Sequence, residues 1–429
     1  MALTGNSAIR DGEAALALPD QTPMSTPHHT STASKGAPWP IVASGLVALA
    51  VAMGIGRFAF TPLMPLMMRD GTLSAAAGAE WAAANYVGYL VGALTASGFA
   101  RDPRRGLLLS LVGVALTTVA MAAVDHDGPA GLGIGLRALA GLFSAWALVC
   151  ASGWCLAELA RRGVAQFGAW IYTGVGLGIA LAGTLAWLGG IQPAARLWLE
   201  LGLVAGLGTV LVWSLSRRQG TAPARIEERE AASLVRPARS GQAALVLCYG
   251  IFGFGYIVPA TFLPAMARAL ASDPRVFGLT WPLFGLAAAL SVAAVARWLT
   301  RVPRQCLWAV AQGVMALGTG LPLAAHALWA VAASAILVGG TFMVATMAGL
   351  QLAREARPDN PTPLLARMTA AFAAGQIVGP VLVRLLGPGR WAGWDALDCT
   401  GAVATVLLVL TAVWLWRTGR PSPESLMPA

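Results

Sequence analysis

Two arginines inside long apolar stretches are the residues of this sequence with the most distinctive chemistry. Arg57 lies in the second half of an apolar run over residues 39–66, and Arg137 lies near the start of a run over 130–157. A guanidinium in hydrocarbon costs at least about 2.5 kcal/mol, so each side chain needs a polar partner or a hydrated cavity. Neither run carries an aspartate or glutamate in its middle. Because a guanidinium presents forked donors that match a carboxylate, we expect both arginines to bind an anionic group.

A structural role is the alternative for the same two arginines. Each could pair with helix carbonyls or with an acidic residue near the end of a span, such as Glu80 or Glu200. At about 1.5 Å per residue, the two arginines lie at similar depths in a membrane, so one ligand could reach both.

Six further polar side chains lie inside apolar stretches. Asn85 and Tyr89 are four residues apart and share a helix face, and Tyr249 shares a face with Tyr256. Tyrosines and amides in a membrane interior either line a cavity or form hydrogen bonds between helices. We predict that these six side chains line one binding cavity together with the arginines: Asn85, Tyr89, Tyr172, Tyr249, Tyr256 and Gln376.

The composition places these residues in a membrane. Of the 429 residues, 57% are hydrophobic and 11% are charged, and the mean hydropathy is +0.67. Soluble domains carry about 25% charged residues. A bilayer offers no water to backbone groups, so spanning segments are helices or closed barrels, and runs this long and continuous are typical of helices. We therefore predict an all-α integral membrane fold.

Twelve apolar runs match the length of a spanning helix, which needs about 20 residues. They cover residues 39–66, 80–100, 106–124, 130–157, 165–189, 194–216, 242–266, 278–299, 305–324, 327–350, 365–386 and 396–416. A hydrophilic connector divides the runs into six and six. The predicted parts are a disordered cytoplasmic tail (1–38), a six-helix bundle (39–216), a cytoplasmic linker (217–241), a second six-helix bundle (242–416) and a cytoplasmic tail (417–429).

The net charge of +10 indicates topology and not nucleic-acid binding. The basic residues lie in short loops, and no basic groove with stacking aromatics is evident. Loop arginines such as Arg101, Arg217 and Arg301 fall on one side of the predicted spans, whereas the opposite side has acidic or mixed loops such as residues 125–127. By the positive-inside rule, both termini are predicted to be cytoplasmic.

The two halves of the chain share a residue pattern at a nearly constant offset. Gly54 pairs with Gly253, Gly56 with Gly255 and Pro65 with Pro264 at an offset of 199, and Trp81 pairs with Trp281 at an offset of 200. Two six-span repeats are typical of secondary transporters, whose binding site lies between the halves. Tyr256 is the counterpart of Arg57 at the same offset and is predicted to face it from the other half.

The first two spans also carry a family pattern. The stretch Gly54-Ile-Gly-Arg57-Phe58-Ala-Phe-Thr61-Pro62-Leu-Met-Pro65, followed by Trp81-Ala-Ala-Ala-Asn85-Tyr86-Val-Gly88-Tyr89, resembles the YbfB/YjiJ group of the major facilitator superfamily. The resemblance covers roughly residues 39–416. It implies a twelve-helix, two-bundle carrier in the bacterial inner membrane that works by alternating access. The two prolines of the first stretch are expected to bend the span near its outer end.

Two charged clusters are predicted to act in gating. The loop after the second span is similar to the gating loop of the superfamily, with Pro103 in place of a usual basic residue. At the inner end of the fourth span, a glutamate and arginines at i, i+3 and i+4 could form a salt-bridge latch, or a solvated surface cluster. The predicted gating residues are Gly98, Asp102, Arg104, Arg105, Glu158 and Arg161.

Three helix motifs resemble patterns that are found in subsets of the superfamily. Residues 137–141 match the Arg-x-x-x-Gly of many proton-coupled members. Residues 174–178 are similar to the antiporter glycine motif, but Ile179 stands where its proline would be. The eleventh span holds a fuller version of this motif at residues 375–380, with the proline at Pro380. Because the motif is expected in the fifth span, its position in the eleventh weakens the interpretation as a drug exporter.

We therefore predict a secondary active transporter that moves a small, anionic organic solute. The alternative is a multidrug or metabolite efflux antiporter, although a site for cationic drugs would want a buried carboxylate. Coupling to protons stays open, because no mid-membrane carboxylate is evident to carry them.

Other classes of protein find no support in the sequence. No nucleotide-binding loop, metal-ligand spacing or catalytic Ser/His/Asp arrangement stands out, so we expect no enzyme activity, no cofactor and no metal. The five scattered cysteines provide no disulfide framework. The expected partners are the solute and the lipid bilayer, and we expect a monomer.

Overall fold

The computed structural model describes residues 37–99, 101–124, 131–217, 239–271, 273, 278–357, 362–387, 389–391 and 393–419. The predicted N-terminal tail up to residue 36, most of the predicted linker, most of the C-terminal tail and the acidic loop over 125–127 lie outside the described residues.

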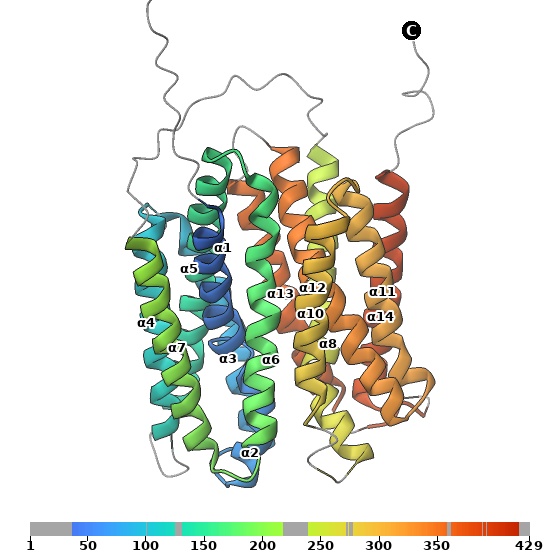
Figure 1. The fold of residues 1–429 in the computed structure, drawn as a ribbon. Helices are drawn as coiled ribbons and strands as arrows, with labels where there is room; N and C mark the ends of the chain where they lie inside the picture. The colour runs from blue at the N-terminus through green and yellow to red at the C-terminus, as the bar shows by residue number, and fades with distance from the viewer. Residues whose placement is uncertain are drawn as a thin grey trace, which may run out of the picture. The chain divides into compact units, whose positions relative to one another are not determined.

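Apart from a single pairing of Trp391 with Trp394, the regular structure of the described residues is helical. The first half contains α1 (Trp39–Leu49), the π-helix η1 (Ala50–Ile55), α2 (Phe60–Arg69), α3 (Ala75–Phe99), α4 (Pro103–Ala120), η2 (Met121–Ala123), α5 (Leu132–Arg161), η3 (Ala165–Tyr172), α6 (Thr173–Leu188) and α7 (Ala194–Arg217) (Figure 1). The second half contains α8 (Arg239–Leu270), α10 (Thr280–Trp298), α11 (Arg304–Ala324), α12 (Leu328–Ala356), α13 (Thr362–Leu386) and α14 (Ala396–Thr418).

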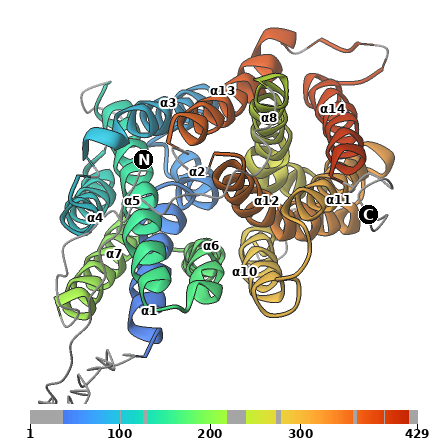
Figure 2. The ribbon, with the colours of Figure 1, turned by 90° about the horizontal axis from the view of Figure 1, so that it is seen from above.

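These helices form two six-helix bundles. Within the described residues, eleven helical segments are long and apolar enough to cross a membrane, and α1, η1 and α2 together make the first of them. The sixth helical segment of the first bundle is α3, whose 25 residues pack along α5. Figure 2 shows α6 beside α10 and α3 beside α13, where the bundles meet. The predicted all-α membrane fold with two six-helix bundles is confirmed.

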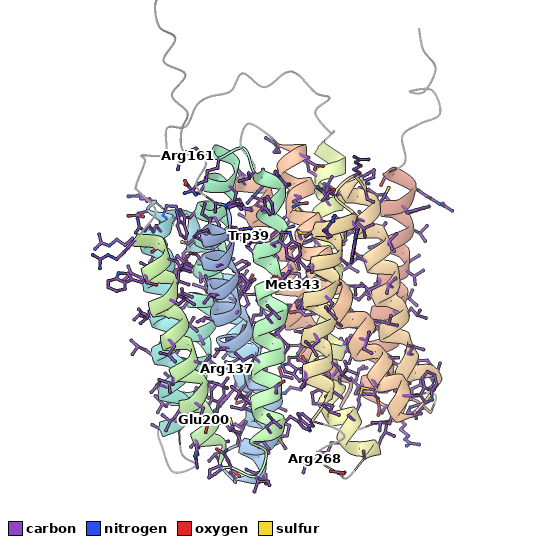
Figure 3. All side chains as sticks on the ribbon, viewed as in Figure 1. Trp39, Arg137, Arg161, Glu200, Arg268 and Met343 are labelled. Carbon is purple, nitrogen blue, oxygen red and sulfur yellow. The ribbon has the colours of Figure 1, made fainter. Side chains whose placement is uncertain are left out.

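The bundles have two end faces, which Figure 3 shows at the top and the bottom. One face, here called the terminal face, holds Trp39 at the start of α1 and Arg161 at the end of α5. The opposite face lies near Glu200 and Arg268.

Glycines let helices of the two bundles approach closely. A side chain at Gly176 of α6 would overlap the backbone of α10 at Gly285 and Ala289, and a side chain at Gly285 would overlap α6 in turn. Farther along α6, a Cβ at Gly183 would lie 2.8 Å from the ring of Pro282. The contact between α6 and α10 is therefore made largely backbone to backbone.

The other two glycines of the 174–178 motif serve contacts inside the first bundle. Side chains at Gly174 and Gly178 would overlap the backbone of the first span at Leu46 and Ala50, and Gly54 packs directly against Gly178. Since i and i+4 share a helix face and i+2 does not, one motif supports packing in two directions.

The first span is interrupted beside Arg57. Bonds from Gly56 N to the Val51 carbonyl, at 3.0 Å, and from Phe58 N to the Met53 carbonyl, at 3.1 Å, are i to i−5 bonds of a π-turn. Residues 56–59 form a turn before α2 begins. Just beyond it, Pro62 has no N–H to donate. The break lies before the prolines, and it leaves backbone carbonyls that need donors from elsewhere.

Candidate functional site

Arg57 crosses from the first bundle to the second. Its side chain is buried, with 3% of its surface exposed, and Nη2 donates a hydrogen bond to Oε1 of Gln376 on α13. Gln376 Nε2 in turn donates to the hydroxyl of Tyr256 on α8. The three side chains therefore form a polar bridge that joins the two bundles.

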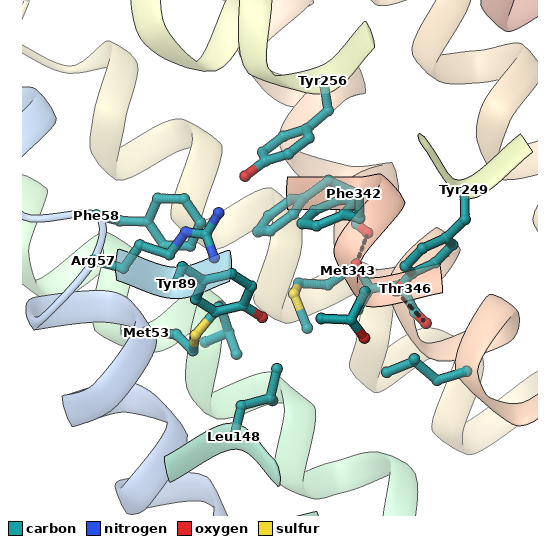
Figure 4. Close-up of a pocket in the computed structure, with 14 residues that line it drawn as sticks. Met53, Arg57, Phe58, Tyr89, Leu148, Tyr249, Tyr256, Phe342, Met343 and Thr346 are labelled. Carbon is teal, nitrogen blue, oxygen red and sulfur yellow. Dashed lines mark hydrogen bonds between the residues drawn. The ribbon is translucent and has the colours of Figure 1, made fainter. Parts of the chain in front are cut away.

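Aromatic rings surround the Arg57 guanidinium. Its central carbon lies 3.9 Å from the ring centroid of Tyr89, 5.3 Å from that of Phe58 and 5.8 Å from that of Tyr86. Figure 4 shows the guanidinium close to the Tyr89 ring and directed toward Phe342 and Tyr256. Cation–π contacts of this kind contribute about 0.5–2 kcal/mol each and offset part of the cost of burial.

The charge of Arg57 is not neutralised by the described residues. None of their carboxylates forms an ion pair with it, and Nε and Nη1 have no hydrogen-bond partner among them. A buried charge without a counter-charge is costly unless a ligand or water completes it. The guanidinium therefore has unused capacity to bind an anion.

Arg137 is equally buried, at 3% exposed, but two of its three guanidinium nitrogens form hydrogen bonds. Nη1 donates to the Gly56 carbonyl at 3.2 Å and Nη2 to the Arg57 carbonyl at 3.1 Å, so the guanidinium caps the break in the first span. The Phe60 ring lies 4.6 Å from its central carbon. Only Nε has no partner in the described part of the chain. This geometry matches the alternative that Arg137 pairs with helix carbonyls.

Asn85 supports Arg137 from the neighbouring helix. Its Nδ2 donates to the Arg137 carbonyl at 2.9 Å. A side chain at Gly141 would overlap the Asn85 backbone, so this glycine allows α3 and α5 to come this close. The Arg-x-x-x-Gly pattern thus places Arg137 and its supporting contact on one face of α5.

A small cavity lies between the bundles on the terminal-face side of Arg57. We call it the central cavity; its volume is about 30 Å³. Its polar lining comes from Arg57, Tyr89, Tyr249, Tyr256, Thr346 and Thr369, and its apolar lining from Met53, Phe58, Leu148, Val175, Phe342, Met343, Leu350 and Phe372. A water molecule needs at least about 10–15 Å³. The central cavity therefore has room for water but must expand to accept an organic solute.

A second cavity, of about 20 Å³, lies on the other side of Arg57. Arg137, Tyr86, Thr61, Thr261 and Trp281 are among its lining residues. Tyr86 and Thr261 approach to 3.5 Å between their hydroxyl oxygens, across the boundary between the bundles. Arg57 and Phe58 line both cavities.

The structure brings together most of the residues that were predicted to bind substrate. Arg57, Tyr89, Tyr249 and Tyr256 line the central cavity, and Gln376 bonds to two of them. Tyr256 reaches Arg57 through Gln376, from the repeat-related position in the second bundle. Asn85 is not among the residues that line the central cavity and bonds instead to the backbone of Arg137. Tyr172 instead bonds to Ser152, with 3.1 Å between their hydroxyl oxygens.

Sequence reasoning missed the apolar wall of the cavity. Phe342, Met343 and Phe372 lie in uninterrupted apolar runs, where a cavity wall and a packed core have the same composition. One usable signal existed: Phe372 is four residues before Gln376 and therefore shares its helix face.

The predicted gating residues lie near the terminal face. Asp102 caps α4 by accepting a hydrogen bond from the backbone N–H of Arg105 at 3.1 Å. Gly98 belongs to the same loop motif as Arg104 and Arg105, and a Cβ at this position would meet open space. Glu158 accepts bonds from Arg161 at 3.0 Å and from Arg162, the C-cap residue of α5, at 2.8 Å. These contacts lie within single helices or their caps, and their part in gating stays a prediction.

Comparisons with known proteins agree with this architecture. Residues 49–414 match the family described as "Uncharacterised MFS-type transporter YbfB". A search of curated proteins found no match. Among solved structures, the chain is similar to a D-xylose-proton symporter, with a TM-score of 0.67 and 15% identity over 91% of this chain and 99% of the other.

A mutant of the nucleoside transporter NupG is also similar, with a TM-score of 0.64 and 11% identity over 88% of this chain and 100% of the other. At these identities the two solved structures show a shared fold and nothing about the solute. The family match extends over most of the chain and therefore identifies the family: this protein belongs to the YbfB family of major facilitator superfamily (MFS) transporters.

Proposed function

We propose that this transporter moves a small organic anion across the bacterial inner membrane by alternating access, with Arg57 as the residue that holds the anionic group. In this proposal the terminal face is cytoplasmic, as the positive-inside rule favours. The protein acts as a carrier and catalyses no reaction.

The observation that supports this proposal most is the state of Arg57. It is a fixed positive charge at the boundary between the bundles, next to a cavity, with two nitrogens that have no partner among the described residues. An anion bound there would supply the missing counter-charge, which favours an anion over a neutral or cationic solute.

The hydrogen-bond geometry of Arg57 links anion binding to movement. A carboxylate binds a guanidinium most strongly as a fork, through Nη1 and Nη2 or through Nε and Nη2. Both forks include Nη2, which donates to Gln376 in this structure. Nη2 has two N–H groups, one in each fork, so Gln376 occupies one fork and leaves the other open. A carboxylate that binds in the occupied fork displaces Gln376 and breaks the polar bridge between the bundles. We propose that substrate binding in this fork releases a contact that holds the bundles together.

Coupling to protons would need no dedicated carrier residue in this scheme. The acidic residues of the described spans lie near helix ends, such as Glu80, Glu158 and Glu355. An organic acid can carry a proton on its own carboxylate, and we propose this as the route if protons move with the solute.

The test is the melting temperature of the full-length protein in detergent across a panel of metabolites. A ligand that binds the folded state raises the free energy of unfolding, by about 2.7 kcal/mol at a ligand concentration of 100 Kd. The melting temperature rises as a result. We expect carboxylates to stabilise the wild type and the control Arg384→Gln, which removes an exposed charge. We expect them not to stabilise Arg57→Gln.

Two outcomes would contradict the proposal. If no anion stabilises the wild type, Arg57 is not an anion site. If lipophilic cations stabilise the wild type and Arg57→Gln equally, the alternative of an efflux antiporter is favoured. Uptake of the best ligand into proteoliposomes, with a pH-sensitive dye inside, then shows whether protons move with it.

A further inference from the structure

We propose that the anion carried by this protein is a monocarboxylate on a flat, apolar body, of the class of aromatic and arylalkanoic acids. This inference rests on the proposed function and specifies the substrate at the same site. Three features of the central cavity support it: one available cation, an aromatic wall, and hydroxyl groups that mostly form hydrogen bonds within the protein.

The central cavity presents one cation. Arg57 lines it, whereas Arg137 lines the second cavity and uses both Nη atoms on the carbonyls of Gly56 and Arg57. A second carboxylate on the solute would therefore lie in the cavity without a counter-charge, at a large desolvation cost. The charge balance favours a monoanion over a dicarboxylate or a phosphate ester.

The wall that faces Arg57 is a stack of flat rings. The Tyr256 ring lies between Phe342 and Phe372, with centroid distances of 5.5 Å to each and interplanar angles of 9° and 5°. Phe58 meets Phe342 edge to face at 6.0 Å. Aromatic rings prefer such stacked or edge-on partners, so a planar body adds favourable contacts that a compact polar body cannot make.

The opposite wall can adapt to a ring. Met53, Leu148 and Val175 lie on the first-bundle side, and Met343 lies beside Phe342 on the second. Methionine side chains are flexible and form favourable contacts with aromatic rings. The cavity could therefore widen around a planar ring when the Arg57–Gln376 bond opens.

Four of the five hydroxyl groups that line the cavity form hydrogen bonds within the protein, and Tyr89 carries the fifth. Thr346 Oγ1 donates to the Phe342 carbonyl and Thr369 Oγ1 to the Leu365 carbonyl, each at 2.8 Å. Tyr256 accepts from Gln376, and Tyr249 donates to the Thr346 carbonyl at 3.5 Å. A polyhydroxylated solute would lose water without gaining matching partners, which disfavours sugars and sugar acids.

The experiment compares solutes that differ in one property at a time. Calorimetry on the full-length wild type in lipid nanodiscs would measure the Kd of benzoate, acetate, terephthalate, glucuronate and benzyl alcohol. One methylene in an apolar pocket changes binding by about 10-fold or more, so we expect benzoate to bind at least about 10-fold more tightly than acetate. We also expect benzoate to bind more tightly than the other three probes.

A variant pair tests the aromatic wall. Phe372→Leu should reduce the preference for benzoate over acetate, because it removes one of the stacked rings. Phe143→Leu is the matched control, because Phe143 packs against Trp146 within the first bundle, at 5.8 Å between centroids. This control should keep the wild-type preference. If Phe372→Leu does not fold, the five probes on the wild type still decide the proposal.

The outcomes separate this inference from the proposed function. If acetate, terephthalate or glucuronate binds as tightly as benzoate, the inference is overturned and the anion carrier stands. If no carboxylate binds while benzyl alcohol does, both are overturned. If benzoate binds most tightly but Phe372→Leu and Phe143→Leu both keep that preference, the assignment to this cavity is overturned.

Discussion

Arg57 and Arg137 are buried to the same extent in adjacent parts of one bundle, yet their surroundings differ. Both Nη atoms of Arg137 donate hydrogen bonds to backbone carbonyls, in a region where α5 packs tightly against α3. Arg57 lies where the two bundles meet, with a single hydrogen bond to Gln376 and two nitrogens without a partner in the described residues. The same residue type at the same burial therefore has a structural role in one place and, in our proposal, a binding role in the other.

The difference shows that the partners of a buried cation indicate its role better than its burial does. A guanidinium whose donors match backbone carbonyls stabilises the fold, and its loss leaves those carbonyls unsatisfied. A guanidinium with unmatched donors at a cavity destabilises the ligand-free state and gains most from an anion. Mutation of Arg137 should consequently lower stability, and mutation of Arg57 should lower anion affinity.

The largest effect on stability is expected from Arg137→Gln. The carbonyls of Gly56 and Arg57 would lose charge-assisted hydrogen bonds, and we expect the free energy of unfolding to fall by about 3 kcal/mol. Unfolding of the purified protein by SDS titration measures this. A stability equal to that of the wild type would show that the break in the first span does not depend on Arg137.

The next largest effect is expected on anion affinity in Arg57→Gln. Removing one partner of a buried charge pair weakens binding by about 100-fold or more. The free energy of unfolding should change by less than about 1 kcal/mol, because the lost cation–π contacts are offset by the removal of an unpaired charge. Calorimetry and SDS titration on the same sample check both. A large loss of stability with unchanged affinity would reverse the roles assigned to the two arginines.

A smaller effect, in the opposite direction, is expected from Gln376→Leu. An anion would no longer compete with the Gln376 amide for Nη2 of Arg57, so its affinity should rise by up to about 10-fold, equivalent to one net hydrogen bond. Gln312→Leu is the matched control, since Gln312 is a buried amide that bonds to Thr411 inside the second bundle. A drop in affinity in Gln376→Leu alone would mean that Gln376 binds the anion directly.

The smallest effect is expected from Tyr172→Phe. Its hydroxyl bonds to Ser152 away from the central cavity, so anion affinity should stay within about 2-fold of the wild type, while stability falls by about 1 kcal/mol. Calorimetry checks the affinity. A loss of affinity comparable to that of Arg57→Gln would restore Tyr172 to the binding site that the sequence predicted.

Much of the architecture was predictable because it depends on local composition. Apolar runs near the length of a bilayer identify the spans, and the repeat at an offset of 199 relates Arg57 to Tyr256 without any structure. These features can be read from neighbouring residues or from self-similarity of the chain.

The partners of the arginines were not predictable in the same way. Gln376 is 319 residues from Arg57, and only the fold brings the two together. The π-turn at residues 50–55 has no signature in an apolar run, so the break in the first span was expected at its prolines and not before them. Because Arg137 donates to carbonyls that this break leaves free, the sequence could not show which carbonyls it would bind.

The glycine contact between α6 and α10 has a consequence for the rate of transport. Where side chains of two helices interlock, sliding one helix past the other requires rotamer changes and transient voids. At Gly176 and Gly285 no side chains interlock, so this crossing can pivot with little rearrangement. We expect the barrier to rocking of the bundles to arise mainly from breaking the Arg57–Gln376–Tyr256 bridge. Turnover would then be governed by the substrate site itself.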